Sequence, residues 1–354
     1  MHLAPLILLF SLLTPQISAR RYHTHRTIHV KSGGNIQAAI SSARPGSTII
    51  VPPGTYAEQL TITTSGLTLI GHDAILTPPS SPITNTCTNL AGAGTQAGIC
   101  ISGSGVVLQN LKDFNGEHLK ILSVGSYVKD TTVTGFTVQN FGGLNIATVG
   151  SENTVVENNH VGSGSQYGVL TVGSKGTVVR HNTVFSTPGV FGFYFIGVCM
   201  DDISTVSIQS NDVSGYFIGL CVQTSHARVM GNYLHDNCVG TFVDPGVKYV
   251  MIQRNRIVNR SISSQAACPP DPTFASGVTI LGAIGTVVRG NWFENLRNGV
   301  VIVDDEGTKT TARGNFVGGN FFRGDGLDLL VNSTGANVVR GNRCRTSSPA
   351  GLCK

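Results

Sequence analysis

Apolar and polar residues alternate along this chain in one short phrase that keeps returning. It reads apolar–x–x–Asn–x–apolar and is followed about ten residues later by Gly–apolar–x–apolar. The copies occupy residues 156–161, 179–184, 208–213, 229–234, 252–257, 288–293, 311–317 and 339–344. Their key residues are Asn159, Asn182, Asn211, Asn232, Asn255, Asn291, Asn315 and Asn342. Two weaker copies precede them, at 108–111 and 134–138.

This repeat predicts a solenoid of stacked coils made of short parallel strands. A coil of this length cannot bury its own apolar residues, so it must stack on its neighbours. Stacking places like residues above like at the strand spacing of roughly 4.8 Å. An Asn at the same corner of every coil then forms an amide ladder, and Asn also tolerates the left-handed backbone of a tight corner.

The repeats resemble those of the right-handed parallel β-helix superfamily, the pectin-lyase-like fold. Their style is similar to that of NosD, a maturation protein of nitrous-oxide reductase, and to carbohydrate-binding β-helix domains. Residues 35–40 open a short helix and residues 45–56 follow it, as in the N-terminal cap of such proteins. The resemblance implies an all-β, single-stranded right-handed parallel β-helix with a short N-terminal capping helix. It implies no single function, because the superfamily includes lyases, hydrolases, esterases, epimerases and non-enzymes.

The chain divides into three expected parts. Residues 1–19 are apolar, end in Ser18-Ala19 and indicate a secretory signal peptide. Residues 20–31 form a His-rich leader, and residues 32–354 form the β-helix. His23, His25 and His29 of the leader are candidate copper or zinc ligands, and a disordered leader is the favoured alternative. No apolar run is long enough for a membrane span.

Together with the signal peptide, the cysteines and sequons indicate a secreted, extracellular eukaryotic protein, and a monomer is expected. All eight cysteines lie after the signal peptide, and an even number in a secreted chain favours disulfides. Cys87 with Cys100 and Cys344 with Cys353 are expected to close local loops. Two central bridges are expected among Cys199, Cys221, Cys238 and Cys268. Asn259 and Asn332 begin glycosylation sequons.

Charge is sparse and argues against a nucleic-acid partner. Charged residues make up 12% of the chain, and the net charge is +5. These charges are scattered, whereas nucleic-acid binding needs a dense basic stripe. They fit a neutral polar surface or a mild preference for acidic polysaccharides.

Three successive coils carry polar residues at one strand end. When the coils are aligned on the Gly before the second strand, Asp201, Gln223 and Asp244 form one external column, with Asp202 beside it. Adjacent carboxylates suit acid–base chemistry on sugars, because crowding raises one pKa. They also suit Ca²⁺, the only cofactor indicated, or form a solvated acidic patch.

Pectin-degrading hydrolases of this fold have a partly similar set. Met200-Asp201-Asp202 resembles their Asp-Asp element, and Ser225-His226-Ala227 lies one coil later at the place of Gly-His-Gly. Arg256-Ile257-Val258 resembles Arg-Ile-Lys without the Lys. Two insertions interrupt the period, an aromatic one at 183–197 and a Pro-rich one at 258–276, and such loops commonly wall a binding groove.

The leading hypothesis is a secreted polysaccharide lyase or glycoside hydrolase that acts in a groove along the helix. Its expected catalytic residues are Asp201, Asp202, Asp244, His226 and Arg256. Its expected substrate-binding residues are Gln223, Phe193, Tyr194 and Phe242. The alternatives are a non-catalytic rod that binds glycans or surfaces, and a cyclase or isomerase with an apolar small-molecule pocket.

Overall fold

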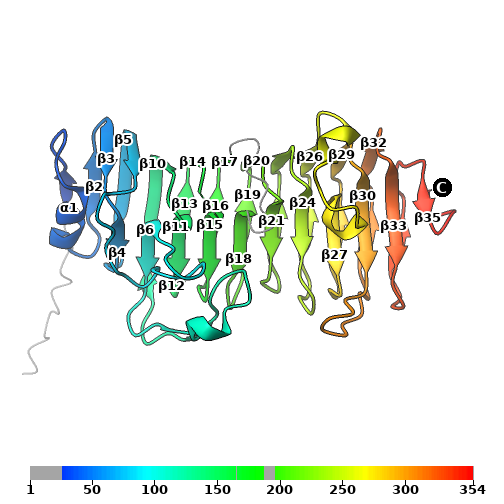
Figure 1. Ribbon diagram of the computed structural model, residues 1–354, viewed down its shortest axis with the longest axis horizontal. Coiled ribbons are helices and arrows are strands. Elements are labelled where there is room, and N and C mark those ends of the chain that lie inside the picture. The colour runs from blue at the N-terminus through cyan, green and yellow to red at the C-terminus, as the bar shows by residue number, and fades with distance from the viewer. Residues whose placement is uncertain (1–25, 165, 187–195, 354) are drawn as a thin grey trace, which may run out of the picture.

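The computed structural model describes residues 26–164, 166–186 and 196–353, and they form a rod of stacked coils (Figure 1). Each regular coil has three strands, and each strand pairs in parallel and in register with its counterpart one coil away. The predicted parallel β-helix is therefore confirmed. The expected signal peptide lies outside the described residues.

The coil faces form two sheets. The larger sheet comprises 20 strands on two faces, joined where β5 and β10 span a corner. Its strands are β1 Thr27–His29, β2 Thr48–Val51, β3 Gly54–Ala57, β5 Thr68–Thr77, β10 Thr132–Gln139, β13 Val155–Glu157, β14 His160–Gly162, β16 Val178–Arg180, β17 Thr183–Phe185, β19 Ser207–Gln209, β20 Asp212–Ser214, β22 Arg228–Met230, β23 Tyr233–His235, β25 Met251–Gln253, β26 Arg256–Val258, β28 Val287–Arg289, β29 Trp292–Glu294, β31 Phe316–Gly318, β32 Phe321–Arg323 and β34 Val338–Arg340.

The third face is an 11-stranded sheet. Its strands are β4 Leu60–Ile62, β6 Ala97–Ser102, β11 Leu144–Val149, β15 Tyr167–Val172, β18 Ile196–Asp201, β21 Ile218–Val222, β24 Val239–Val243, β27 Ser276–Leu281, β30 Asn298–Val303, β33 Leu327–Asn332 and β35 Ser347–Ser348. The remaining elements are β7 Val107–Leu108, β8 Ile121–Ser123, β9 Val128–Lys129, β12 Ser151–Glu152, the helix α1 Ile36–Ser42 and the 3-10 turns η1 Leu111–Asp113, η2 Ile262–Gln265 and η3 Pro272–Phe274. No helix among the described residues is long and apolar enough to cross a membrane.

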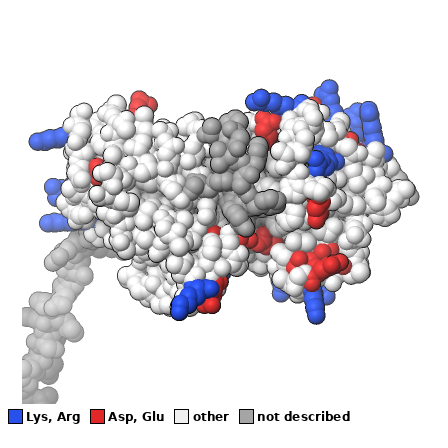
Figure 2. Space-filling view, viewed as in Figure 1, with Lys and Arg blue, Asp and Glu red and all other residues white. Residues whose placement is uncertain are grey.

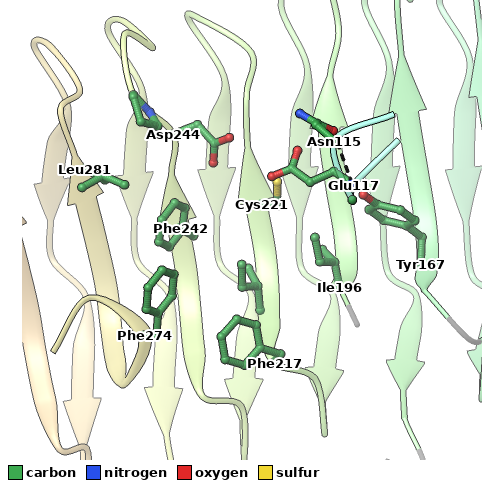
Figure 3. Close-up of a pocket in the computed structure, with 13 residues that line it drawn as sticks. Asn115, Glu117, Tyr167, Ile196, Phe217, Cys221, Phe242, Asp244, Phe274 and Leu281 are labelled. Atoms are coloured by element: carbon green, nitrogen blue, oxygen red, sulfur yellow. Dashed lines mark hydrogen bonds between the residues drawn. The ribbon is translucent and has the colours of Figure 1, made fainter. Parts of the chain in front are cut away.

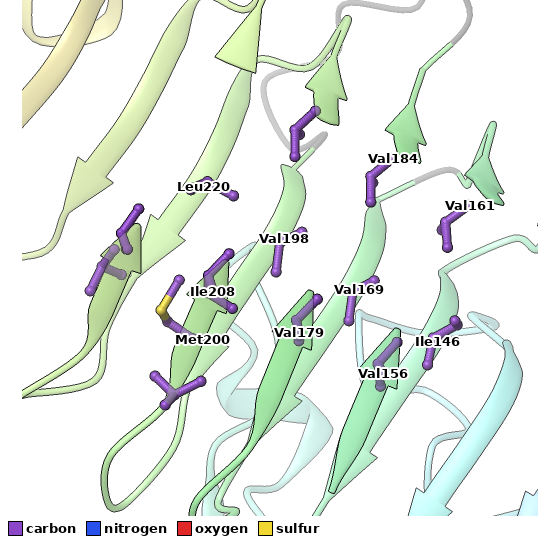
Figure 4. Close-up of a cluster of buried hydrophobic side chains, with 14 of the residues drawn as sticks. Ile146, Val156, Val161, Val169, Val179, Val184, Val198, Met200, Ile208 and Leu220 are labelled. Atoms are coloured by element: carbon purple, nitrogen blue, oxygen red, sulfur yellow. The ribbon is translucent and has the colours of Figure 1, made fainter. Parts of the chain in front are cut away.

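The interior of the rod consists of columns of aliphatic side chains contributed by all three faces. Val156, Val179 and Ile208 stack from one face, and Val169, Val198 and Leu220 stack from the opposite one (Figure 4). The alternation of strand side chains directs these residues inward, as the sequence predicts.

The predicted Asn ladder exists, with one change of register. Each side-chain amide donates to the next Asn, from Asn159 through Asn255 to Asn291. The next member is Asn320, which continues to Asn342. The expected member Asn315 instead begins a separate ladder with Asn337 at another corner. The prediction was wrong here because Asn315 and Asn320 have the same neighbours in the sequence: each follows a Gly and precedes a Phe.

The N-terminal capping helix is confirmed as α1. Asn35 accepts a hydrogen bond from the Ala38 N–H at its start, and the Glu58 carboxylate accepts from the N–H groups of Ile36 and Gln37 at 2.9 and 3.0 Å. The free N–H groups of the first turn are thus satisfied. Strand β1 pairs with β2, so His29 belongs to the first coil and not to a free leader.

Candidate functional site

A hairpin-like excursion covers the outer face of the third sheet. Residues 104–126 leave the rod and return at one point, where the N–H groups of Ser104 and Ser126 each donate to the other's carbonyl. The expected weak repeat at 108–111 is therefore wrong: it contains the end of β7, which pairs antiparallel with β8, and the turn η1. The excursion meets a second apolar layer on β11, β15, β18 and β21. Outward-pointing residues there, such as Leu170 and Cys199, are consequently buried.

A pocket of about 400 Å³ lies beside the excursion. Its walls are the excursion at 115–117, the strand ends of β21 and β24, and the region of η3 (Figure 3). The lining residues are Asn115, Gly116, Glu117, Tyr167, Ile196, Phe217, Ile218, Cys221, Phe242, Asp244, Pro245, Phe274 and Leu281. A volume of this size suits a small molecule or a short sugar segment.

The pocket has an aromatic end and an acidic end. Phe274 lies between the other two aromatic rings: its centroid is 5.9 Å from that of Phe242 and 5.8 Å from that of Phe217. At the acidic end the Gln223 amide nitrogen donates to Glu117 Oε2 and to Asp244 Oδ2, each at 2.7 Å. One amide group thus holds two carboxyl groups from distant parts of the chain.

A second network adjoins this pair. Lys120 Nζ lies 2.7 Å from Gln223 Oε1 and 3.1 Å from Asp201 Oδ2. The buried His118 ring places Nε2 3.0 Å from the same carboxylate oxygen and Nδ1 3.1 Å from the Tyr167 hydroxyl. Since an ionised carboxylate only accepts, His118 Nε2 donates to Asp201, while Nδ1 is paired with the Tyr167 hydroxyl.

The two aspartates of the column have opposite pKa shifts. Burial raises the pKa of Asp244 to about 8, and the neighbouring Glu117 charge adds to this. Burial also favours the neutral form of Asp201, but the His118 hydrogen bond and the Lys120 charge outweigh it and lower the pKa of that carboxyl. At neutral pH Asp244 is largely protonated and Asp201 is ionised.

The structure brings together four of the residues expected from the sequence. Asp201, Gln223 and Asp244 stand on successive coils, where the backbone N–H of Gln223 donates to the Met200 carbonyl and that of Asp244 to the Val222 carbonyl. Phe242 lines the same pocket. Asp202 turns away from it: its carboxylate accepts from the Ser174 N–H at 3.2 Å, and burial raises its pKa to about 7.

The other expected residues lie elsewhere. His226 is exposed at a corner, where its ring stacks on Tyr249. Arg256 is on β26 of the larger sheet, and its guanidinium lies 3.9 Å from Glu294. Phe193 and Tyr194 fall outside the described residues. The Pro-rich insertion does contribute a wall, through Phe274.

Sequence reasoning did not select Glu117, His118 or Lys120 as site residues. They belong to the excursion, which carries no repeat, so no alignment of coils can place them. One signal is present: Glu117-His118-Leu119-Lys120 sets three ionisable groups within a single short stretch of a chain with only 12% charged residues.

The cysteines follow the expectation in part. Cys87–Cys100, Cys344–Cys353 and the central bridge Cys238–Cys268 are present. The expectation of a second central bridge is wrong, because Cys199 and Cys221 are free thiols. They are in-register neighbours on the parallel strands β18 and β21, so their Cα–Cβ bonds run side by side, at a spacing wider than the roughly 3.8 Å that a disulfide prefers between Cβ atoms.

The two sequons differ in accessibility. Asn259 is buried, and its amide donates to the Asn237 carbonyl at 3.5 Å. Asn332 is exposed at the end of β33. Only the second is open to a glycan in the folded protein.

Comparison with known proteins extends the fold assignment. Residues 85–270 match the family model described as periplasmic copper-binding protein (NosD). No curated protein has a sequence similar enough to be called a relative. Among solved structures, PfbA, a surface adhesin of Streptococcus pneumoniae, has 13% identity and a TM-score of 0.58 over 87% of this chain and 82% of its own. DFA-IIIase from Arthrobacter chlorophenolicus A6, in complex with GF2, has 13% identity and a TM-score of 0.50 over 88% and 92%. At this identity both show the fold alone.

The described residues do not fit a copper centre. Among them no group of three or more His, Cys, Asp or Glu side chains lies close enough together to hold a metal ion. Of the three leader histidines, His23 and His25 lie outside the described residues. The expected Ca²⁺ site fits no better, because Asp201 already contacts His118 and Lys120.

Proposed function

We propose a function for this chain, which belongs to the NosD family of parallel β-helix proteins. It is a secreted carbohydrate-active enzyme that cleaves a glycosidic bond in the pocket beside its excursion. Asp244 is the general acid, Glu117 is the nucleophile beside it, and a sugar ring rests on the aromatic end. Asp201, His118 and Lys120 hold Tyr167 and Gln223 in place.

One observation carries the proposal: a single amide nitrogen binds Glu117 and Asp244, each at 2.7 Å. The two bound oxygens are therefore separated by at most twice that distance. Retaining glycosidases hold their carboxyl groups roughly 5–5.5 Å apart, whereas inverting ones need about 6.5–9.5 Å to admit a water molecule. The separation thus favours retention, with Glu117 as nucleophile and Asp244 as acid and then base.

The pKa values fit these roles. A general acid must be protonated at the working pH, and the pKa of Asp244 is raised to about 8 by burial and by Glu117. The Tyr167 hydroxyl, which is paired with His118 Nδ1, lines the same pocket. Phe217, Phe242 and Phe274 supply the apolar surface on which one face of a sugar packs.

The test uses purified protein with a panel of neutral and uronic-acid oligosaccharides, read for new reducing ends and for unsaturated ends. Asp244→Asn and Glu117→Gln should each abolish the product, while Glu306→Gln, which changes an exposed carboxylate outside the pocket, should not. Proton NMR should show that the first product has the same anomeric configuration as the substrate. Unsaturated ends would mean that the enzyme is a lyase and not a hydrolase. A first product of inverted configuration would contradict the roles assigned to Glu117 and Asp244.

One observation favours a second candidate, an enzyme that cyclises or isomerises a small molecule. The pocket is walled largely by aromatic and aliphatic side chains and is bounded by the excursion, unlike a long polymer groove. Two results together would support this candidate. The protein would form no glycosidase product, and it would bind small apolar compounds with an affinity that is lost in Phe242→Ala. If the protein is a non-catalytic rod, the Asp244→Asn variant should instead bind every glycan with the same affinity as the unaltered protein does.

A further inference from the structure

A second pocket lies at the C-terminal end of the rod, between its last coils. Its volume is about 480 Å³. The lining residues are Phe321, Phe322, Arg323, Gly324, Arg343, Cys344 and Arg345. Three of these seven residues are arginines, in a chain where charged residues are otherwise scattered. Figure 2 shows Lys and Arg atoms gathered at the upper right, where Figure 1 places β29 and β32.

The arginines stand on a fixed backbone. The N–H of Arg343 donates to the Asn320 carbonyl at 2.8 Å, and the Asp328 carboxylate accepts from the N–H of Arg345. Between them, Cys344 is bonded to Cys353. A fixed backbone reduces the conformational entropy lost when a ligand binds.

An aromatic stack also holds one guanidinium. Arg343 lies over the Phe321 ring, 5.0 Å from its centroid, and Phe321 stacks on Trp292 with centroids 4.1 Å apart. The contact with the ring fixes the side chain and leaves the N–H groups at the edge of the guanidinium for an acceptor.

Among the described residues, nearby carboxylates form an ion pair with only one of the three pocket arginines. Glu294 is shared between Arg323, at 3.7 Å, and Arg256, at 3.9 Å, and it also accepts from the Trp292 ring N–H. Asp328 accepts from the backbone N–H groups of Arg345 and Thr346. Within residues 26–353, excluding 165 and 187–195, no ion pair joins the guanidinium of Arg343 or Arg345 to a carboxylate.

We propose that this C-terminal arginine pocket is a second binding site, which takes the carboxylate or sulfate groups of an acidic polysaccharide. The planar guanidinium fork matches such groups with paired hydrogen bonds. The site is independent of the proposed glycosidase pocket, since it lies on the last coils and that pocket lies on the outer face of β15–β27.

The geometry favours a polysaccharide over a nucleic acid. Single-stranded nucleic acids are bound by free aromatic faces on which bases stack, along a continuous basic groove. Here the faces of Trp292 and Phe321 are turned to each other, and Arg343 covers the far side of Phe321. The Phe321 ring therefore supports Arg343 and offers no free face to a base.

The experiment measures the affinity of the full protein for polygalacturonate, dextran sulfate, uncharged dextran and oligo(dT) by calorimetry. The test variant combines Arg323→Gln, Arg343→Gln and Arg345→Gln. The matched control removes the same charge from exposed arginines elsewhere on the rod, with Arg44→Gln, Arg228→Gln and Arg289→Gln. We expect the test variant to lose about tenfold or more in affinity for the acidic polysaccharides, which is roughly 1.4 kcal/mol, and the control to lose much less.

Each other outcome would overturn the proposal. Equal losses in both variants would mean diffuse attraction, binding of dextran as tight as that of the acidic chains would remove the role of charge, and tighter binding of oligo(dT) would identify a nucleic-acid surface. No binding to any acidic chain would also refute it. Activity on a small glycoside should be unchanged in the test variant, so this result and that for the glycosidase pocket are separable.

Discussion

At the scale of single residues, two aspartates in the same column of the rod differ in charge because the excursion places different side chains beside them. Asp201 and Asp244 occupy equivalent strand ends two coils apart. The excursion brings His118 and Lys120 to the first and Glu117 to the second. The pKa of the first carboxyl is lowered and that of the second is raised, so two identical side chains acquire different chemical roles.

The raised pKa of Asp244 predicts a specific dependence of stability on pH. The folded protein keeps a proton that the unfolded chain releases above the ordinary pKa of 3.8, up to the folded value of about 8. Its contribution to stability is thus full below pH 3.8, falls as the pH rises, and is lost once the pH passes about 8. In Asp244→Asn this loss is absent, so the variant should gain in Tm relative to the unaltered protein between pH 4 and 8.

Thermal unfolding followed by circular dichroism across that pH range checks this expectation. A gain of 1 kcal/mol corresponds to about 1–3 °C for a chain of this size. Glu306→Gln is the control and should run parallel to the unaltered protein. Parallel curves for Asp244→Asn as well would show that the proton is not held in the fold.

The two free cysteines predict a thiol count that depends on folding. Three disulfides take six of the eight cysteines. The other two, Cys199 and Cys221, are buried. Burial raises the pKa of the Cys199 thiol, and the contact with Cys199 raises the pKa of the Cys221 thiol. A neutral, buried thiol reacts slowly. Titration with a thiol reagent should find almost none in the native protein and two after denaturation without reductant. A count of none after denaturation would establish a fourth disulfide.

At the scale of elements, the Asn ladder sets the register of the coils. The Asn232 amide donates to the Ile208 carbonyl and to Asn255, while its oxygen accepts from the N–H and the amide of Asn211. Each member thus links three coils inside the rod, where water cannot replace it. The repeat visible in the sequence is the trace of this bonding pattern.

Removal of one ladder amide should therefore destabilise the protein according to its burial. Asn232→Ala leaves buried donors and acceptors unpaired, at a cost on the order of 1–3 kcal/mol in the free energy of unfolding. Asn337→Ala removes similar bonds from the shorter ladder, but Asn337 is half-buried and water can take its place. Chemical denaturation should show the larger loss for Asn232→Ala. Equal losses would mean that burial does not determine the cost.

At the scale of the whole molecule, the sequence predicts what repeats and misses what departs from the repeat. The coils, the ladder and the column of Asp201, Gln223 and Asp244 follow from periodic spacing, and the capping helix follows from the family resemblance. The excursion does not, because its place is set by tertiary contact with the outer face of the sheet. Glu117 and His118 therefore join the site from about a hundred residues away, without any signal in the repeat itself.

The excursion is also a separable part of the molecule, which predicts the outcome of its removal. Its two ends are paired at Ser104 and Ser126, and the backbones of Gly105 and Gly125 are adjacent. Deletion of residues 106–124, with Gly105 joined to Gly125 through a short Asn-Gly turn, should leave the stacked coils intact. It uncovers the apolar layer formed by residues such as Leu144, Ala147 and Leu170.

The deleted protein should keep the β-sheet circular dichroism of the full chain, bind the dye ANS strongly through the exposed layer, and lose glycosidase activity along with Glu117. Retained affinity for acidic polysaccharide through the distant arginine pocket provides the internal control for folding. Activity that survives the deletion would place the chemistry elsewhere on the rod. A protein that unfolds would instead show that the excursion stabilises the coils it covers, because the apolar layer on a solenoid face is then part of its core.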